Sequence, residues 1–548
     1  MTTFWGPPLS EDPDTGALTL GGFLRESVAA NGPREAVVAY NANGRLSWTY
    51  ADLEGAARAI ARALIAAGVE PGERVALLMG NRPSWVASAF GVALAGGVLV
   101  PVNTYLEARE LAYVLSHSDA ALLLMQTELA GHDYVSGISS LTASGDLPAL
   151  RAAACVGLDE PRGEIEPWSA FLGRGNDVPD EAVDSRANAV SPDDDGIIIY
   201  TSGTTAAPKG VLHTHAPPCM QSRRFVRHLA LDGDVRSWSA FPLFWTAGFA
   251  MVMGATLACG GCLVLQERFE PGEALRLLAT ERVTTPHAWP HQLGELEEHP
   301  DWADADLSAM RHIESFGPFG RHPSVKVVED AWTSRAAFGL TETFTIVTST
   351  PADAPREIRD KATGRILPGN AIRILDPATD GALPVGEPGE IAVAGASLMK
   401  GYVKVLREQT FDADGFFHTG DAGWMDENGF LHWTGRTSDM IKTGGANVSP
   451  VEIEMELLHH PKLKAAGAVG VPHPTLGQIV VVVAVPNEHS DVDEEDVRGF
   501  LKGRIASYKI PRRVVLVREE ELTLTGNQKI KPEDLRALAT ARLARSSD

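Results

Sequence analysis

The stretch YTSGTTAAPKG, residues 200–210, directly follows the short apolar run GIII, residues 196–199. The β-branched run predicts a buried strand. The loop after it combines hydroxyl side chains and glycines with a single lysine, Lys209. Backbone N–H groups, hydroxyls and a lysine can all bind phosphate oxygens. It is not a Walker A loop, because Pro208 stands where that pattern requires its second glycine. On these residues alone, a phosphate-binding loop and a solvated turn both stay open.

Segments of helical and strand character alternate through the first part of the chain. Residues 48–69 form an amphipathic helical pattern, and the strand-like run RVALLM follows at residues 74–79. The stretches SWVASAFGVALAGG and VLVPV, residues 84–102, repeat this order. The alternation favours a largely parallel sheet with helices on both faces. The period-two pattern of GEPGEIAVAG, residues 386–395, suggests a separate β subdomain.

At 548 residues the chain is too long for a single hydrophobic core. Turn-rich sequence begins near Arg436, and after it helix, strand, strand and helix patterns follow at residues 450–460, 465–471, 478–486 and 494–505. The expected fold is α/β, with a large N-terminal domain of parallel-rich sheets flanked by helices, a β subdomain, and a small mobile α+β C-terminal domain. The predicted boundaries are residues 1–435 for the N-terminal domain, 436–438 for a hinge and 439–548 for the C-terminal domain.

The composition excludes several classes of partner. The chain carries 48 basic and 71 acidic residues, a net charge of −23, which argues against nucleic acid as a partner. Four cysteines do not make a disulfide framework and suit a reducing cytosol, so we expect a cytoplasmic protein. The CxxC pair Cys259 and Cys262 lacks a second pair, so a packed strand edge is favoured over a metal site.

Neither a signal peptide nor a membrane span is expected. The first residues, MTTFWGPPLSEDPD, have no basic start and no apolar core. No run reaches the roughly 18 uninterrupted apolar residues that a membrane span needs. The sequence leaves open a peripheral membrane contact and a homodimer.

Several further motifs change the interpretation of the loop. Together with TSGTTAAPKG, they resemble the adenylate-forming superfamily of acyl-CoA synthetases, luciferases and nonribosomal peptide adenylation domains, which are AMP-binding enzymes. The resemblance covers almost the whole chain. The motifs, in chain order, are FGLTET (338–343), GEIAVAGASLMKGY (389–402), FFHTGDAGWMDENGFL (416–431), GRTSDMIKTGGANVSPVEIE (435–454) and LTGNQKIK (524–531).

The resemblance implies an ATP site. Phe338 and Gly339 would lie beside the adenine, Thr341 would contact phosphate, and Glu342 would bind Mg²⁺. Asp421 would hold the ribose hydroxyls, with Arg436 nearby, although a turn-capping role for Asp421 is the structural alternative. The loop predicted to close over the β- and γ-phosphates consists of Thr201, Ser202, Gly203, Thr204, Thr205 and Lys209, with Thr204 as a weaker candidate for the metal.

The resemblance also implies two half-reactions, adenylation of the acid and formation of the thioester, with different residues for each. Lys529 matches the lysine that bridges carboxylate and phosphate during adenylation. Lys442, Gly444 and Gly445 lie in the segment that would form the thioester face, and Ser438 stands at the hinge. Solvated lysines are the structural alternative for Lys442 and Lys529. Three residues depart from the family pattern, and none removes a charge that the chemistry needs: Ala206, Ser438 and Gln528.

The segment AFPLFWTAGFAMVMG, residues 240–254, resembles the part of the family that lines the acyl pocket. It is almost wholly apolar, and Trp245 stands where histidine is frequent. Trp245 and Phe249, with Phe316 and Gly317, are the predicted pocket residues, with core packing as the alternative for the aromatic ones. The segment contains no aspartate to hold an α-ammonium group, which disfavours an amino-acid substrate.

The predicted function is that of an ATP-dependent acyl-CoA synthetase, an acid–thiol ligase that works through an acyl-AMP intermediate. Its expected substrate is an apolar carboxylic acid, with a medium- or long-chain fatty acid first. The alternatives are an aryl or alicyclic acid–CoA ligase and an acyl-AMP ligase that loads a carrier protein. ATP, Mg²⁺ and coenzyme A are the implied cofactors.

Overall fold

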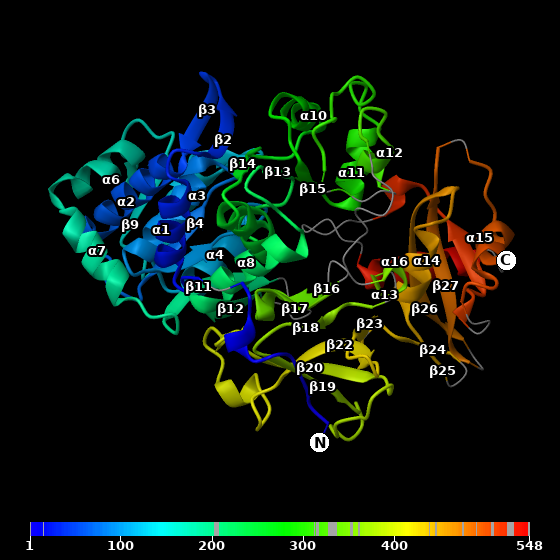
Figure 1. The fold of residues 1–548 in the computed structure, drawn as a ribbon. Coiled ribbons are helices and arrows are strands. Elements are labelled where there is room, and N and C mark those ends of the chain that lie inside the picture. The colour runs from blue at the N-terminus through cyan, green and yellow to red at the C-terminus, as the bar shows by residue number, and fades with distance from the viewer. Residues whose placement is uncertain are drawn as a thin grey trace. The chain divides into compact units, whose positions relative to one another are not determined.

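The computed structural model describes residues 2–14, 16–201, 208–311, 313, 317–326, 337–350, 355–359, 362–437, 439–443, 446–473, 476–488, 490–505, 509–522 and 531–545. The chain divides into two compact units. The larger unit comprises residues 4–371 and 393–417, and the smaller unit comprises residues 1–3, 372–392 and 418–548. Figure 1 shows their helices and strands, coloured along the chain.

An eight-stranded sheet forms the first layer of the larger unit. Its strand order is β10 (Ile165–Pro167), β9 (Ala152–Val156), β6 (Ala120–Gln126), β4 (Arg74–Leu78), β5 (Val98–Pro101), β11 (Asp195–Thr201), β12 (Lys209–Thr214) and β21 (Gly401–Tyr402). Neighbours from β10 to β11 are parallel, whereas β12 and β21 are antiparallel to the strands they pair with. The predicted parallel sheet is confirmed.

Both faces of this sheet are covered, because successive side chains of a strand point to opposite faces. In β4, Val75 and Leu77 belong to one hydrophobic core and Ala76 and Leu78 to another. The first core includes residues of α1 (Leu20–Asn31), α2 (Tyr50–Ala66) and α3 (Pro83–Leu94), and the second includes residues of α4 (Ala108–His117) and α5 (Tyr134–Ser144). Strands buried on both faces are typical of parallel sheets.

The helix predicted over residues 48–69 is α2, and its start follows from a capping box. The Thr49 hydroxyl accepts the backbone N–H of Asp52, and the Asp52 carboxylate accepts the backbone N–H of Thr49. These reciprocal bonds satisfy donors that have no partner within the helix.

A second sheet of the larger unit has the order β15 (Thr285–His287), β13 (Arg236–Ser239), β14 (Cys262–Val264), β2 (Glu35–Asn41) and β3 (Gly44–Thr49). All neighbours are parallel except the hairpin of β2 and β3. Cys262 is buried at the start of β14, as the strand-edge interpretation of ACGGC predicts.

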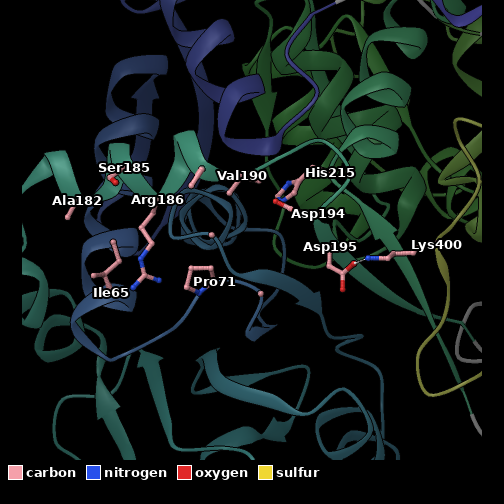
Figure 2. A pocket seen from close by; sticks show the side chains of 13 residues that line it. Ile65, Pro71, Ala182, Ser185, Arg186, Val190, Asp194, Asp195, His215 and Lys400 are labelled. Atoms are coloured by element: carbon pink, nitrogen blue, oxygen red, sulfur yellow. Dashed lines mark hydrogen bonds and ion pairs between the residues drawn. The ribbon is translucent and has the colours of Figure 1, made fainter.

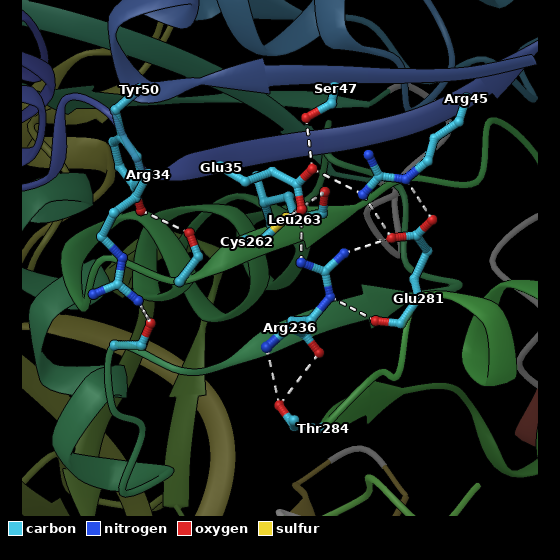
Figure 3. Close-up of polar contacts among 12 residues, drawn as sticks. Arg34, Glu35, Arg45, Ser47, Tyr50, Arg236, Cys262, Leu263, Glu281 and Thr284 are labelled. Carbon is cyan, nitrogen blue, oxygen red and sulfur yellow. Dashed lines mark hydrogen bonds and ion pairs between the residues drawn. The ribbon is translucent and has the colours of Figure 1, made fainter. Parts of the chain in front are cut away.

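A network of ion pairs ties the β2–β3 hairpin to β13 and to Glu281, which follows α10 (Pro271–Thr280) (Figure 3). Arg236 contacts Glu35 at 2.7 Å and Glu281 at 2.5 Å, and Arg45 contacts both carboxylates at 2.8 Å. Burial alone would raise the pKa of Glu35, but hydrogen bonds from Ser47, Arg236 and Arg45 outweigh it and lower the pKa to about 2.

The other elements of the larger unit are short strands and helices. The strands are β1 (Phe4–Trp5), β7 (Glu128–Leu129), β8 (His132–Asp133), β16 (Ala337–Leu340), β17 (Thr345–Ser349) and β18 (Arg365–Ile366). The helices are α6 (Trp168–Arg174), α7 (Asp180–Ala189), α8 (Ala216–His228), the π-helix η3 (Ala247–Gly254), α9 (Ala255–Ala258), α11 (Pro290–Glu297), α12 (Pro318–Arg321) and α13 (Arg356–Arg359). Among the described helices, none combines the length and apolar character needed to cross a bilayer.

The smaller unit contains most of a β subdomain followed by the C-terminal α+β elements. β19 (Asn370–Leu375), β20 (Gly389–Gly395), β22 (Phe417–Met425) and β23 (Leu431–Arg436) are successive neighbours in one sheet, which confirms the β subdomain predicted from the pattern at residues 386–395. A second sheet orders β25 (Ala446–Val448), β24 (Ile441–Thr443), β27 (Gly477–Pro486) and β26 (Leu463–His473), with β28 (Arg513–Leu516) parallel to β27. The helices are α14 (Pro450–Leu457), α15 (Glu494–Leu501) and α16 (Pro532–Arg545).

Candidate active site

The strand–loop–strand that opens the candidate site is the hairpin of β11 and β12. Thr201, the last residue of β11, pairs with Lys209, the first residue of β12. Because β11 is parallel to β5, Thr201 lies at the carboxyl edge of the parallel strands, where α/β sheets bind ligands. The predicted loop residues between them lie outside the described residues: Ser202, Gly203, Thr204, Thr205 and Ala206.

Tyr402 joins two predicted site residues that are far apart in the sequence. Its hydroxyl donates to Glu342 Oε1 at 2.6 Å, and the Lys209 ammonium lies 4.9 Å from the centre of its ring. The structure thus gives Lys209 and Glu342 a common neighbour. Tyr402 ends the motif GEIAVAGASLMKGY and has no predicted role, because no local pattern indicates a contact 60 residues away.

The FGLTET motif forms a sharp turn after β16. Gly339 lies so close to the following strand that an added Cβ would fall 1.6 Å from the carbonyl oxygen of Thr345. Two non-glycine residues in succession, Phe344 and Thr345, have positive φ angles of 47° and 101°. Such conformations cost free energy and concentrate at functional sites. Phe338 is buried in β16, and its N–H donates to Thr348 Oγ1 at 3.0 Å.

Buried polar side chains hold this turn. His213 on β12 contacts the carbonyl oxygen of Thr341 at 2.8 Å through Nε2. Gln221 on α8 donates to the carbonyl oxygens of Thr343 and Ile346 at 2.9 and 2.6 Å. Burial lowers the pKa of His213 to about 4, so the ring is neutral at neutral pH.

The predicted acyl-pocket residues separate into two environments. Trp245 is half-buried, and its ring centroid lies 5.3 Å from that of Phe244 and 6.4 Å from that of Tyr105. Phe249 is only 1% exposed and packs against Trp85 and Phe344 in the core. Gly317 precedes α12, and Phe316 lies outside the described residues.

A small pocket adjoins this aromatic group. Tyr105 and Phe244 line it together with Asn81, Thr104, Pro242 and Arg268. These residues follow the carboxyl ends of β4, β5, β13 and β14. Parallel strands present their ligand sites at this edge.

In the smaller unit, Asp421 and Arg436 face each other across β22 and β23. Arg436 Nε lies 3.2 Å from Asp421 Oδ1, and Trp433 Nε1 donates to the same oxygen at 3.2 Å. The Asp421 side chain is 6% exposed and that of Arg436 51%. Lys442 is exposed on β24. Ser438, Gly444, Gly445, Gln528 and Lys529 lie outside the described residues.

Two family models match the chain. Residues 24–403 match AMP-binding enzymes, and residues 452–529 match the C-terminal domain of AMP-binding enzymes. The chain belongs to the AMP-binding enzyme family.

Relatives of this AMP-binding enzyme are acid–CoA ligases by name. YngI of Bacillus subtilis, which is named as an acyl-CoA synthetase, is 31% identical over 94% of this chain and 96% of its own length. Feruloyl-CoA synthase of Amycolatopsis is 32% identical and indoleacetate–CoA ligase of Aromatoleum aromaticum 31%; each covers 90% of this chain and 94% of its own length. The chain is therefore an AMP-forming acid–CoA ligase, an enzyme that forms a carbon–sulfur bond.

Solved structures of similar proteins show the same α/β fold. An anthranilate CoA ligase matches with a TM-score of 0.76 at 22% identity, covering 96% of this chain and 98% of its own. The ATP-bound MatB from Rhodopseudomonas palustris matches with a TM-score of 0.73 at 27% identity, over 96% of this chain and 99% of its own.

The larger unit of this AMP-binding enzyme also has a cleft of about 740 Å³ (Figure 2). Lys400 and Asp195 form a 2.6 Å ion pair on its wall, and His215 also lines it. Asp195 begins β11, whereas Thr201 ends it. This cleft therefore lies at the opposite edge of the sheet and contains none of the predicted site residues.

Proposed function

We propose that this acid–CoA ligase activates an aromatic or alicyclic carboxylic acid. The observation that carries the proposal is the group of three aromatic rings, Tyr105, Phe244 and Trp245, within the segments that follow the parallel strands. Aromatic rings pack favourably in edge-to-face and offset arrangements. Two relatives at 31–32% identity are named for aromatic acids, ferulate and indoleacetate. Together these findings favour the aryl or alicyclic alternative over a medium- or long-chain fatty acid.

The first half-reaction would be adenylation. A carboxylate oxygen of the acid attacks the α-phosphorus of ATP, and pyrophosphate leaves with the electron pair of the broken P–O bond. Negative charge develops on the phosphoryl oxygens, so fixed cations and N–H donors accelerate the step. In this proposal Lys209 and the loop at residues 201–209 bind the phosphates. Lys529 bridges the carboxylate and the α-phosphate.

Glu342 is suited to a divalent metal. The Tyr402 hydroxyl donates to Oε1, and none of the described residues donates a hydrogen bond to the second carboxylate oxygen. Mg²⁺ prefers oxygen ligands and is often held by one or two carboxylates plus substrate phosphates. A bound Mg²⁺ would neutralise phosphate charge during the transfer. Glu342 would hold it, with Thr204 as the weaker candidate.

Different predicted residues would bind the different parts of the nucleoside. Phe338, Gly339 and Thr341 would bind the adenine and phosphate side, and Asp421 would accept hydrogen bonds from the ribose hydroxyls. The pairing with Arg436 and Trp433 supports this, because it keeps the nearly buried Asp421 carboxylate in a fixed orientation.

The second half-reaction would transfer the acyl group to coenzyme A. The thiolate attacks the acyl-AMP carbonyl, a carbon–sulfur bond forms, and AMP leaves with the electrons of the acyl–phosphate bond. We infer that the segment with Lys442, Gly444 and Gly445 accompanies the pantetheine arm, after rotation of residues 439–548 about Ser438. Glycines allow such a close approach to the backbone.

A panel of carboxylic acids tests this proposal. Pyrophosphate release is measured with ferulate, indoleacetate, benzoate, a bicyclic alicyclic acid, octanoate and palmitate, each with and without coenzyme A. The aromatic or alicyclic acids should give the highest kcat/KM. A higher kcat/KM for palmitate or octanoate would instead indicate a fatty acid as the substrate. Release unaffected by coenzyme A, with transfer to a phosphopantetheinylated carrier protein, would favour the carrier-loading alternative.

A further inference from the structure

Tyr402 lies between two side chains of opposite charge in the larger unit. Its hydroxyl donates to Glu342 Oε1 at 2.6 Å, and the Lys209 ammonium lies 4.9 Å from the centroid of its ring. A hydrogen bond to an ionised carboxylate is shorter and stronger than one between neutral groups. An ammonium group near an aromatic ring is attracted by the electron density of the ring face. One side chain therefore interacts favourably with both charges.

The backbone around Tyr402 is fixed to the same two partners. Tyr402 is the last residue of β21 and pairs with Val211 on β12, the strand that begins with Lys209. Two residues before β21, the backbone N–H of Met399 donates to the carbonyl oxygen of Glu342 at 2.7 Å. The segment thus bonds both to the strand of Lys209 and to the backbone of Glu342. Displacement of Tyr402 by solvent is disfavoured, because the ring is half-buried and packs against Phe417.

We propose that Tyr402 is a positioning residue of the adenylation half-reaction. Its hydroxyl sets the orientation of the Glu342 carboxylate that receives the divalent metal, and its ring keeps the Lys209 ammonium near the same place. Neither contact requires Tyr402 to touch the acid substrate. The inference rests on the proposed function, since it takes from there the roles of Glu342 and Lys209.

The two contacts can be separated by substitution. Tyr402→Phe removes the hydroxyl bond to Glu342 and keeps the ring near Lys209. Tyr402→Leu removes both. Loss of a group that orients a metal ligand typically lowers metal affinity or activity by about 10- to 100-fold.

The chain offers a matched control in Tyr40. Its hydroxyl donates to Glu281 Oε1 at 2.6 Å, and the Arg276 guanidinium lies 4.3 Å from its ring centroid. Tyr40 therefore has the same pair of contacts, but with none of the predicted site residues. Tyr40→Phe measures what the loss of such a tyrosine–glutamate bond does to general stability.

The experiment measures metal binding and turnover on the full chain. Affinity for Mn²⁺ is determined by electron paramagnetic resonance with a non-hydrolysable ATP analogue, and Mg²⁺ dependence is determined from acid-dependent pyrophosphate–ATP exchange. Tyr402→Phe should weaken Mn²⁺ binding and raise the half-saturating Mg²⁺ concentration by about tenfold. KM for the acid should not change. Tyr402→Leu should in addition raise KM for ATP, and Tyr40→Phe should match the wild type in all of these.

Each outcome bears on a different statement. Equal metal affinities in Tyr402→Phe and the wild type would overturn the positioning role, as would an equal loss in Tyr40→Phe. If the wild type shows no pyrophosphate–ATP exchange with any of the acids tested, the proposed function fails. The Mn²⁺ measurement, which needs no turnover, still decides whether Tyr402 orients a metal ligand.

Discussion

His213 donates a hydrogen bond from Nε2 to the carbonyl oxygen of Thr341, 2.8 Å away, and its ring is completely buried. A carbonyl oxygen can only accept, so the proton of the neutral ring resides on Nε2. Nδ1 is buried without a hydrogen-bond partner among the described residues. The residue next to Glu342 is thus held by a histidine that stays uncharged at neutral pH.

This histidine makes stability dependent on pH. Burial lowers the pKa of His213 to about 4 in the folded state, below the ordinary value of 6.5. A depressed pKa contributes stability above pH 6.5, and this is lost as pH falls towards 4, by roughly 3 kcal/mol in total. Burial also lowers the pKa of His215 to about 4, so protonation of His215 destabilises the folded protein over the same pH interval.

Urea unfolding of His213→Gln at pH 7.5 and pH 5 checks this prediction. The variant should be less stable than the wild type at pH 7.5, because glutamine replaces the buried imidazole that donates to the carbonyl oxygen of Thr341. It should lose less stability between the two pH values, because one of the two buried histidines is gone. Parallel losses in both proteins would show that His213 does not titrate as described.

Gly339→Ala should disrupt the FGLTET turn. The added methyl group would lie 1.6 Å from the carbonyl oxygen of Thr345, so the backbone must move. We expect a loss of more than about 2 kcal/mol of stability together with weaker ATP binding, measured by calorimetry. Gly55 is the control, because it is exposed in α2 and an added Cβ would meet no atom within 4 Å. Gly55→Ala should stabilise the chain by about 0.5–1 kcal/mol.

Arg236→Leu should destabilise the protein by about 3 kcal/mol, because it removes one of the two arginines that pair with the buried Glu281 carboxylate. Arg236 bonds to Glu281, whose side chain is 5% exposed, and to Glu35. Denaturation midpoints are compared for this variant and for the control Arg311→Leu. Arg311 pairs with Asp232, and both side chains are largely exposed. Exposed pairs contribute about 0–1 kcal/mol. Equal losses of stability in the two variants would contradict a larger contribution from the buried ion pairs than from the exposed one.

Local patterns predicted the elements of the fold well, but not how they meet. The apolar run at residues 196–199 and the helix at residues 48–69 carry their own periodicity and caps, so their structure follows from neighbouring residues. The contact between Tyr402 and Glu342 depends on the pairing of β21 with β12, which no short-range pattern encodes.

The aromatic residues of the acyl segment illustrate a second limit. Trp245 and Phe249 are four positions apart and look equivalent in the sequence, although Trp245 precedes the π-helix η3 and Phe249 lies within it. Only the packing distinguishes them: Phe249 is enclosed by Trp85 and Phe344, whereas Trp245 stays half-buried beside Tyr105. Roles for Phe316 and Lys529 rest on the resemblance alone, because these residues lie outside the described ones.

Trp245→Leu should change recognition of the acid. Loss of the aromatic contact should raise KM for the best aromatic acid about tenfold, which corresponds to about 1.4 kcal/mol. KM for ATP should stay the same, because Trp245 lies outside the predicted nucleotide residues. Steady-state kinetics with the acid and ATP varied separately provide the measurement. A rise in KM for ATP, or none for the acid, would remove Trp245 from the acid pocket.

We propose that the chain couples an apolar acid to AMP before any thiol is involved. Exchange of labelled pyrophosphate into ATP, measured with Mg²⁺ and the acid panel but without coenzyme A, tests it most directly. We expect exchange that depends on an aromatic or alicyclic acid, followed by equal amounts of AMP and thioester once coenzyme A is added. Background exchange with every acid, or AMP and thioester formed only when coenzyme A is present from the start, would contradict it.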